Sequence, residues 1–336
     1  MTNDTIEKRN RQWVLASRPA GRADESNFKL VDAAVPSIEQ GQALIKVQYL
    51  SLDPYMRGRM DDVKSYAPSQ KLDEVMVGGT VGEVVESKSD QFHRGDMVVG
   101  MGGWQEYFVT DGAGVRIVDA RRVSPSAYLG VLGMPGVTAW YGLLRIGRPK
   151  VGETVVVSAA SGAVGSVVGQ LARIHGARAV GFAGGAAKCD YVVRALGFDA
   201  CIDYKSDNAR AAFADATPNG VDVVFENVGG AVFDMALARM NTGGRVALCG
   251  LIAGYNGQDI ALRNVRSILV NRLAVTGFII PDHMDLWPQA LEELARHVAS
   301  GALKYRETIA TGIESAPKAF IGLLNGANVG KQLVKL

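Results

Sequence analysis

Hydrophobic and polar positions divide the chain into two parts of different character. In the first part, Ala43 to Leu50 alternates between two faces, and Thr80–Val85 and Met97–Gly100 are short apolar runs, the latter preceded by a Gly95-Asp96 turn. Alternation with a period of two, interrupted by turn residues, is typical of β-strands. The pattern therefore predicts a predominantly β structure for residues 1–128.

From about residue 150 the pattern changes to strand, helix, strand. Thr154–Ala159 is a short apolar run, and Ala163–His175 carries apolar residues at helical spacing. The further predicted strands are Ala179–Ala183, Ala200–Tyr204, Val221–Glu226, Val246–Gly250 and Ala274–Phe278. Strands that alternate with helices form parallel sheets, so this part is expected to be an α/β, doubly wound sheet.

The last part of the chain predicts two helices and a strand. A helix is expected over about 285–300, with Asp285 as its N-cap and Gly301 just past its end. A shorter helix is expected near Pro317–Leu324, followed by a strand over Gln332–Leu336. The pattern contains no internal repeat.

Composition favours a small-molecule function. A chain of 336 residues with 48% hydrophobic residues is long enough for two packed domains. Its 36 lysines and arginines against 34 acidic residues, without a basic run, argue against nucleic-acid and membrane-surface partners. The sequence lacks an apolar run long enough to span a membrane.

The N-terminal sequence and the cysteines point to the cytoplasm. MTNDTIEKRN has no apolar core of a secretory signal. Cys189, Cys201 and Cys249 are far apart and odd in number. We therefore expect reduced thiols and a cytoplasmic location.

The strand that ends at Ala159 is followed by Ala160-Ser161-Gly162-Ala163-Val164-Gly165, a dinucleotide fingerprint whose first glycine is replaced by alanine. Gly162 would let the backbone approach a pyrophosphate, and Gly165 would let the helix pack on the sheet. A strand before and a helix after this segment favour a Rossmann dinucleotide-binding domain over a plain turn.

The end of the second strand predicts NADPH rather than NADH. NAD-binding domains usually carry an acid there, which binds the ribose 2′-hydroxyl. Here the sequence reads Phe182-Ala183-Gly184-Gly185-Ala186-Ala187-Lys188, without a carboxylate. Lys188 is thus the candidate ligand of a 2′-phosphate, the alternative being a solvated helix lysine.

The sequence offers no plausible zinc site. Catalytic zinc needs three protein ligands, and structural zinc usually needs four clustered cysteines. No Cys-x-x-Cys pair is present, and the four histidines are separated from one another along the chain. These are His93, His175, His283 and His297.

Several further segments resemble one protein family over nearly the whole chain. Besides the fingerprint, they are Leu52–Met60 (LDPYMRGRM), Leu132–Ala139 (LGMPGVTA), Glu226–Gly230 (ENVGG), Cys249–Asn256 and Asn328–Lys331. They are similar to the zinc-independent medium-chain dehydrogenases/reductases, in the leukotriene B4 12-hydroxydehydrogenase/prostaglandin reductase-like group, with plant double-bond reductases and bacterial NADPH-dependent curcumin reductase. Zinc-dependent relatives carry a cysteine near Asp53-Pro54 and Gly-His-Glu near Gly78-Gly79, and both are absent.

The resemblance implies a domain organisation and a set of site residues. It implies a GroES-like catalytic domain over 1–128 completed by 301–336, a Rossmann domain over 129–300, and a homodimer. The cofactor positions, from the fingerprint and the resemblance together, are Ala160, Gly162, Ala163, Val164, Gly165, Lys188, Tyr204, Asn227, Cys249, Tyr255, Phe278 and Asn328. The candidate substrate-pocket residues are Tyr55, Tyr66, Trp104 and Met284, each with a core or surface role as the alternative.

Together these features predict an NADPH-dependent reduction of the C=C bond of α,β-unsaturated ketones or aldehydes. A conjugated enone accepts hydride at its β-carbon, and the Tyr255 hydroxyl is expected to stabilise the resulting enolate oxygen. Two alternatives stay open: an NADPH:quinone reductase, and a non-catalytic NADPH-binding protein.

Overall fold

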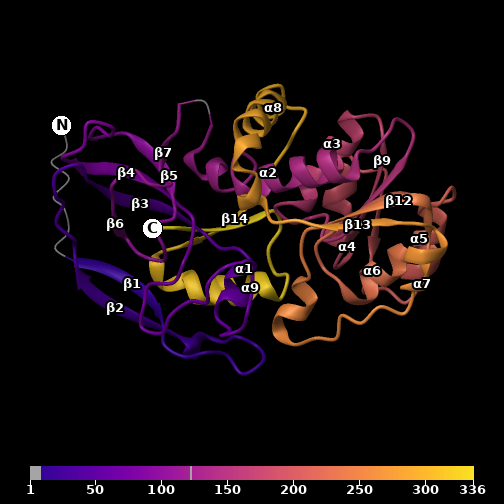
Figure 1. The fold of residues 1–336 in the computed structure, drawn as a ribbon, viewed down its shortest axis with the longest axis horizontal. Helices are drawn as coiled ribbons and strands as arrows, with labels where there is room; N and C mark the ends of the chain where they lie inside the picture. Colours follow the sequence, from indigo (N-terminus) through magenta and orange to yellow (C-terminus); the bar gives the residue numbers. More distant parts are fainter. Residues whose placement is uncertain (1–8, 122) are drawn as a thin grey trace. The chain divides into compact units, whose positions relative to one another are not determined.

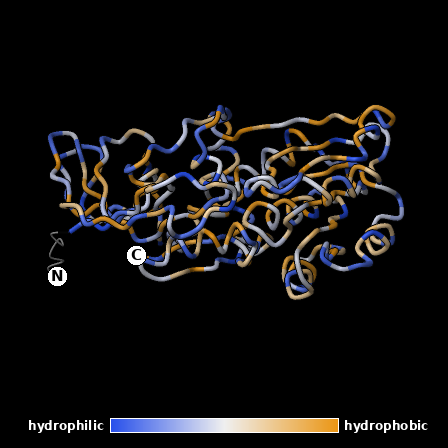
Figure 2. The backbone as a smooth tube through the Cα atoms, turned by 90° about the horizontal axis from the view of Figure 1, so that it is seen from below, coloured by the Kyte–Doolittle hydropathy of each residue, from blue (hydrophilic) through white to orange (hydrophobic). Residues whose placement is uncertain are grey.

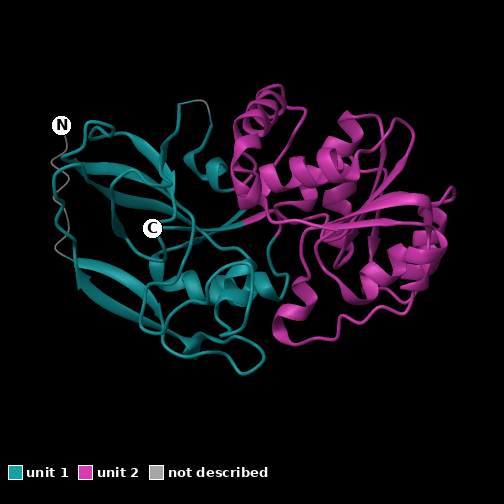
Figure 3. Cartoon of the chain, viewed as in Figure 1, with its two compact units in different colours: residues 1–129, 307–328, 332–336 teal, residues 130–306, 329–331 magenta. Residues whose placement is uncertain are grey.

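The computed structural model describes residues 9–121 and 123–336. The prediction about a secretory signal concerns mainly residues 1–8, which lie outside the described residues. The chain divides into two compact units (Figure 3). Unit 1 contains the described residues up to Leu129, Glu307–Asn328 and Gln332–Leu336, and unit 2 contains Gly130–Arg306 and Val329–Lys331.

Unit 1 is built from β-strands, as the alternating pattern predicts. Its strands are β1 (Arg9–Leu15), β2 (Phe28–Ala34), β3 (Ala43–Ser51), β4 (Thr80–Ser87), β5 (Met97–Gly100), β6 (Tyr107–Thr110), β7 (Arg116–Ile117), β14 (Glu307–Thr311) and β15 (Lys331–Lys335). Strands β1 and β2 form a two-stranded ribbon, and the others form a seven-stranded sheet in the order β14-β15-β3-β4-β5-β7, with β6 paired to β3. The helical elements are η1 (Glu25–Asn27), α1 (Tyr55–Arg59), η2 (Pro125–Leu129), η7 (Ile313–Ser315) and α9 (Ala316–Leu324).

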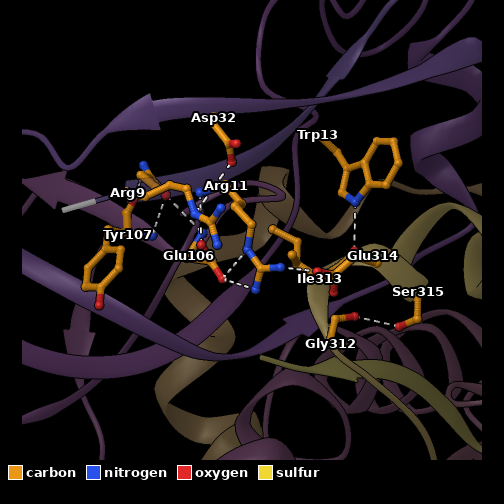
Figure 4. A network of polar contacts seen from close by, with 11 residues as sticks. Arg9, Arg11, Trp13, Asp32, Glu106, Tyr107, Gly312, Ile313, Glu314 and Ser315 are labelled. Atoms are coloured by element: carbon orange, nitrogen blue, oxygen red, sulfur yellow. Dashed lines mark hydrogen bonds and ion pairs between the residues drawn. The ribbon is translucent and has the colours of Figure 1, made fainter. Parts of the chain in front are cut away.

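Polar contacts fasten the C-terminal segment to the first strand of unit 1 (Figure 4). Arg11 on β1 donates to Glu106 through Nε (2.9 Å) and Nη2 (2.6 Å), and it forms an ion pair with Glu314. The indole Nε1 of Trp13 donates to the carbonyl oxygen of Ile313 at 2.7 Å. Residues about 300 positions apart in sequence are thereby joined in one unit.

Unit 2 is an α/β sheet of six parallel strands in the order β10-β9-β8-β11-β12-β13. The strands are β8 (Thr154–Val157), β9 (Arg178–Ala183), β10 (Ala200–Asp203), β11 (Val221–Glu226), β12 (Met240–Leu248) and β13 (Ala274–Gly277). The α-helices are α2 (Met134–Tyr141), α3 (Gly165–Ile174), α4 (Ala186–Asp190), α5 (Ala209–Ala216), α6 (Gly230–Leu237), α7 (Arg266–Val270) and α8 (Trp287–Ala299). Shorter helical segments are η3 (Gly142–Gly147), η4 (Tyr191–Ala195), η5 (Ile252–Asn256) and η6 (Ile280–Leu286).

Helices cover both faces of the sheet of unit 2 (Figure 1). Phe213 of α5 and Phe233 of α6 are buried against strand residues such as Phe182 and Val224. On the other face, helix α3 buries the apolar residues whose helical spacing predicts this helix, including Leu171. Hydrophobic segments alternate with hydrophilic ones along the backbone (Figure 2). The predicted doubly wound architecture is confirmed.

Several element boundaries differ from the prediction by a few residues, and two of the differences have a clear physical reason. Helix α8 begins at Trp287 and its N-cap is Leu286, so the assignment of Asp285 as N-cap is wrong. Pro288 in the first turn has no N–H to donate and fixes where the helix starts, and the residues before it form η6 instead. Strand β12 begins at Met240 rather than Val246, because the turn-forming residues Asn241 to Gly244 hide its first half in the sequence.

Candidate functional site: the carboxyl ends of the parallel strands

The fingerprint segment forms a tight loop between β8 and α3. Ala159 has a left-handed φ of +50°, which turns the chain sharply as it leaves the strand. A Cβ on Gly165 would collide with the carbonyl oxygen of Ala159, so only glycine lets α3 start this close to the strand. Around Gly162 the nearest atom to a built Cβ is a carbonyl oxygen at 3.1 Å, and no other lies within 4 Å. The loop therefore leaves space on the side of Gly162.

This loop has a donor for an anion. Among the described residues, the backbone amide of Val164 donates to no protein acceptor, whereas the parallel bridge between Gly162 and Gly330 engages the amide of Ala163. Gly330, in the short C-terminal segment of unit 2, donates its amide to the carbonyl oxygen of Ser161 at 2.7 Å. Asn328 directly precedes this segment in the chain. An available amide beside an open glycine loop fits the pyrophosphate of a dinucleotide.

A second turn, after β9, carries the predicted phosphate ligands. A Cβ on Gly184 would lie 2.9 Å from the Tyr204 hydroxyl, so the tyrosine side chain lies over this turn. Asp203 accepts the amide of Gly185 at 2.9 Å through Oδ1 and thereby fixes the turn that leads to Lys188. Burial, and then a neighbouring lysine, lower the pKa of Lys188. Lys188 and Tyr204 thus belong to one small region at the ends of β9 and β10.

A buried acid organises the ends of the central strands. The Glu226 side chain is fully buried, and its Oε1 accepts hydrogen bonds from Ser158 Oγ (2.9 Å) and from the amides of Val228 (2.6 Å) and Gly229 (2.7 Å). Among the described residues its Oε2 has no hydrogen-bond partner. Burial raises the pKa of this carboxyl, and the hydrogen bonds oppose the shift only in part.

The same network fixes Asn227. Its amide donates to Ser158 Oγ at 2.7 Å, and its side-chain Nδ2 donates to the carbonyl oxygen of Ser158 at 2.8 Å. The amides of Cys249 and Gly250 donate to the carbonyl oxygen of Glu226 at 2.9 and 3.1 Å. The residues after β8, β11 and β12 are therefore joined at one edge of the sheet.

Tyr255 and Phe278 lie close to this edge. A Cβ on Gly250 would lie 3.4 Å from the carbonyl oxygen of Asn227 and 3.9 Å from the Tyr255 hydroxyl, which places that hydroxyl near both residues. Phe278 follows β13, and its ring packs at 6.2 Å, edge to face, on Phe225 of β11. The structure thus gathers Asn227, Tyr255 and a partly buried aromatic ring where parallel strands end.

The candidate substrate residues have different surroundings. Trp104 is fully buried between Phe28, at a centroid distance of 5.3 Å, and Phe320, at 5.5 Å, and this packing favours its core role. Tyr66 is 59% exposed and Met284 is 57% exposed. Burial raises the pKa of the Tyr55 hydroxyl, and the charge of Asp53 adds to the rise.

Within residues 9–121 and 123–336, no group of three histidine, cysteine or acidic side chains lies close enough together to hold a metal ion. The histidines are nevertheless not all isolated in space. The Nε2 atoms of His175 and His297 lie 3.6 and 3.8 Å from Oε1 of Glu293. His283 stacks on Tyr141 at 4.1 Å.

Two residues of this region were not singled out from the sequence. Lys205 follows Tyr204 directly, and its charge contributes to the lowered pKa of Lys188. Glu226 directly follows the apolar residues Val223, Val224 and Phe225, and a buried acid is unusual there. A charged residue directly after three consecutive apolar strand residues is the signal that could have identified Glu226.

Two family models match the chain. An N-terminal domain of oxidoreductases matches residues 11–118, and a domain described as zinc-binding dehydrogenase matches residues 163–296. The second match covers the sheet of unit 2 that carries the candidate site.

Curated proteins and solved structures match over nearly full length. The chain is 46% identical to NADPH-dependent curcumin reductase of Escherichia coli (98% of this chain, 97% of that protein). It is 39% identical to the NADP(+)-dependent 2-alkenal reductase of Nicotiana tabacum (97% of each). The crystal structure of CurA from Vibrio vulnificus in complex with NADPH superposes with a TM-score of 0.93 at 46% identity (97% of this chain, 98% of that chain). The chain therefore belongs to the zinc-independent medium-chain dehydrogenase/reductase family.

Proposed function

We propose that this protein uses NADPH to reduce the C=C bond of α,β-unsaturated ketones and aldehydes. The observation that carries the proposal is the position of the Tyr255 hydroxyl beside Gly250, near the carboxyl ends of β11 and β12. Ligands of α/β sheets bind outside the carboxyl ends of the strands. Relatives named as curcumin reductase and 2-alkenal reductase support the same substrate class.

The chemistry requires a hydrogen-bond donor for an oxygen that gains negative charge. NADPH supplies a hydride, which adds to the β-carbon of the enone. The charge moves to the carbonyl oxygen, and the Tyr255 hydroxyl donates a hydrogen bond to it. A proton from water or from Tyr255 then reaches the α-carbon and completes the reduction.

The remaining site residues receive roles consistent with this reaction. The fingerprint loop and Asn328 hold the pyrophosphate, Lys188 and Tyr204 hold the 2′-phosphate, Asn227 holds the nicotinamide ribose, and Phe278 lies beside the nicotinamide. Tyr55, Tyr66 and Met284 serve the substrate pocket. The part expected over 129–300 acts as the NADPH-binding domain, and 1–128 with 301–336 acts as the catalytic domain.

An acceptor panel tests the proposal against its rivals. Oxidation of NADPH and NADH is followed with enones, saturated ketones and quinones of matched size. The proposal expects consumption of enones with NADPH and formation of the saturated ketone. Turnover of quinones alone would assign a quinone reductase, and turnover of neither class would indicate a binding protein.

We also propose that the protein is a homodimer. Strand β13 ends the six-stranded sheet, and all its residues are exposed. Beside it, α7 exposes Leu269 (78%) and Val270 (50%). An exposed strand edge next to apolar side chains is a surface that a second copy can cover. Sedimentation should give twice the mass of one chain, and Leu269→Asp should shift it toward the monomer. A monomeric parent protein would refute this.

The proposed location is the cytoplasm, where thiols stay reduced. Cys189, Cys201 and Cys249 are free in the structure. None of the described helices is long and apolar enough to cross a membrane. Cell fractionation followed by enone-dependent NADPH oxidation would test the location.

A further inference from the structure

A second lysine lies at the turn that carries the proposed 2′-phosphate ligands. A Cβ on Gly184 would lie 3.1 Å from Cε of Lys205 and 2.9 Å from the Tyr204 hydroxyl. Both side chains therefore extend over the backbone of the turn that follows β9. Lys205 belongs neither to the fingerprint nor to the segments that resemble the family.

The two lysines of this region are electrostatically close. The charge of Lys205 lowers the pKa of Lys188, after the larger effect of burial. Like charges that face each other repel, and an anion between them removes that cost. Two lysines and a phenol hydroxyl form a donor set suited to a dianionic phosphate.

One carboxylate holds the turns that carry both lysines. Oδ1 of Asp203 accepts the amide of Gly185 at 2.9 Å and the amide of Lys205 at 3.0 Å. These backbone hydrogen bonds lower the pKa of Asp203, so the group is ionised at neutral pH. The charge of Lys205 acts on this carboxylate, and with Lys188 nearby the group of one carboxylate and two lysines carries a net positive charge. The position of Lys205 is thus fixed by the fold, although its side chain is exposed.

We propose that Lys205 is a second cationic ligand of the NADPH 2′-phosphate, and that Lys188 and Lys205 together set the preference for NADPH over NADH. This inference rests on the proposed use of NADPH. Each lysine can contact the 2′-phosphate alone when the other is replaced. Single substitutions should therefore weaken phosphate recognition, and the double substitution should leave only the contribution of the Tyr204 hydroxyl.

The experiment isolates the 2′-phosphate by comparing two fragments. Calorimetric titration measures the affinity of the full-length protein for 2′,5′-ADP and for 5′-AMP, which differ by that phosphate. Lys205→Ala should weaken 2′,5′-ADP about tenfold, the lower end for a charge-assisted hydrogen bond, and leave 5′-AMP unchanged. Lys188→Ala should act similarly, and the double variant should lose most of the preference for 2′,5′-ADP over 5′-AMP, with only the Tyr204 hydroxyl left to contact the 2′-phosphate.

An exposed lysine of unit 2 provides the matched control. Lys150 is exposed and lies before β8, outside the turns after β9 and β10, so Lys150→Ala should change neither affinity. Because Lys205 is exposed, its alanine variant should keep the parent Tm. Unchanged 2′,5′-ADP binding by Lys205→Ala, with weakened binding by Lys188→Ala, would overturn the role of Lys205 and leave NADPH use intact. A parent protein that does not distinguish the two fragments would overturn both.

Discussion

The buried Glu226 gives a prediction whose magnitude follows from its hydrogen bonds. Its Oε1 accepts three of them, from Ser158, Val228 and Gly229, in a site without solvent access. Glu226→Ala leaves all three donors without this acceptor. Glu226→Gln keeps a carbonyl oxygen at the same place and carries no charge at any pH.

Each buried donor that loses its partner costs about 1–3 kcal/mol. Three such losses, softened by a water entering the space, should destabilise Glu226→Ala by about 3–5 kcal/mol. That is a large share of the total of about 5–15 kcal/mol for a typical protein. Glu226→Gln keeps the three bonds and should lose at least about 2 kcal/mol less.

The stability difference between Glu226→Gln and the parent should also depend on pH. Burial raises the pKa of Glu226 in the folded state above its unfolded value, so the native protein holds this proton more tightly. The parent should therefore lose stability as pH rises from the unfolded pKa toward the folded one, by up to about 1.4 kcal/mol per pH unit. The glutamine variant has no such titration, so its free energy of unfolding should rise relative to that of the parent as the pH increases.

Urea unfolding of the parent and both variants, at about pH 5.5 and about pH 8, measures these quantities. A stability gap between Glu226→Gln and the parent that does not change with pH would mean equal pKa values in both states. It would refute the argument from burial. Equal stabilities of the alanine and glutamine variants would refute the hydrogen-bond argument.

Four further predictions test the site. Tyr255→Phe should lower enone turnover by about tenfold to a thousandfold while NADPH binding is retained, and unchanged turnover under conditions where hydride transfer limits the rate would reduce Tyr255 to a packing residue. Lys188→Ala should lower the ratio of NADPH to NADH efficiency about tenfold, and an unchanged ratio would leave it a surface lysine. Gly165→Val should destabilise the protein by about 3 kcal/mol and weaken NADPH binding, because its Cβ meets the Ala159 carbonyl oxygen; a parent-like Tm would contradict this. Prolonged chelation should leave activity unchanged, and loss of activity with stoichiometric zinc would contradict the expected metal independence.

Secondary structure can be predicted from the sequence where the hydrophobic residues repeat with a single period, that of a strand or that of a helix. The predicted range of strand β11, Val221–Glu226, agrees with the structure, because its short apolar run Val223-Val224-Phe225 is followed closely by the turn residues Gly229 and Gly230. The beginning of β12 was missed because Asn241, Gly243 and Gly244 are typical of loops, yet here they belong to a strand held by its parallel neighbour. Tertiary pairing overrode the local preference.

The candidate site was readable only in part, since its parts come from separate strands. Lys188 stood out because the expected acid was absent there. Lys205 could not be identified in this way, because a lysine after a strand is typical of a solvent-exposed loop. Glu226 could not either, because it lies inside the segment Glu226–Gly230 that resembles the family and the resemblance assigns it no separate role. Only the parallel order β9-β10 brings Lys205 to the turn of Lys188, and only the ends of β8 and β11 bring Ser158 to Glu226.

The hydrogen bond from Gly330 to Ser161 has a consequence for how the protein is made. Synthesis proceeds from the N-terminus, so the six strands of unit 2 are complete while the last residues are still inside the ribosome. The nucleotide loop then lacks the segment Val329–Lys331 that lines it. A nascent chain could fold the sheet of unit 2 early but would complete its cofactor loop only after Val329–Lys331 has been made. A chain that stops before Val329 would lose this segment together with β15, so the cofactor loop and the sheet of unit 1 would both be incomplete.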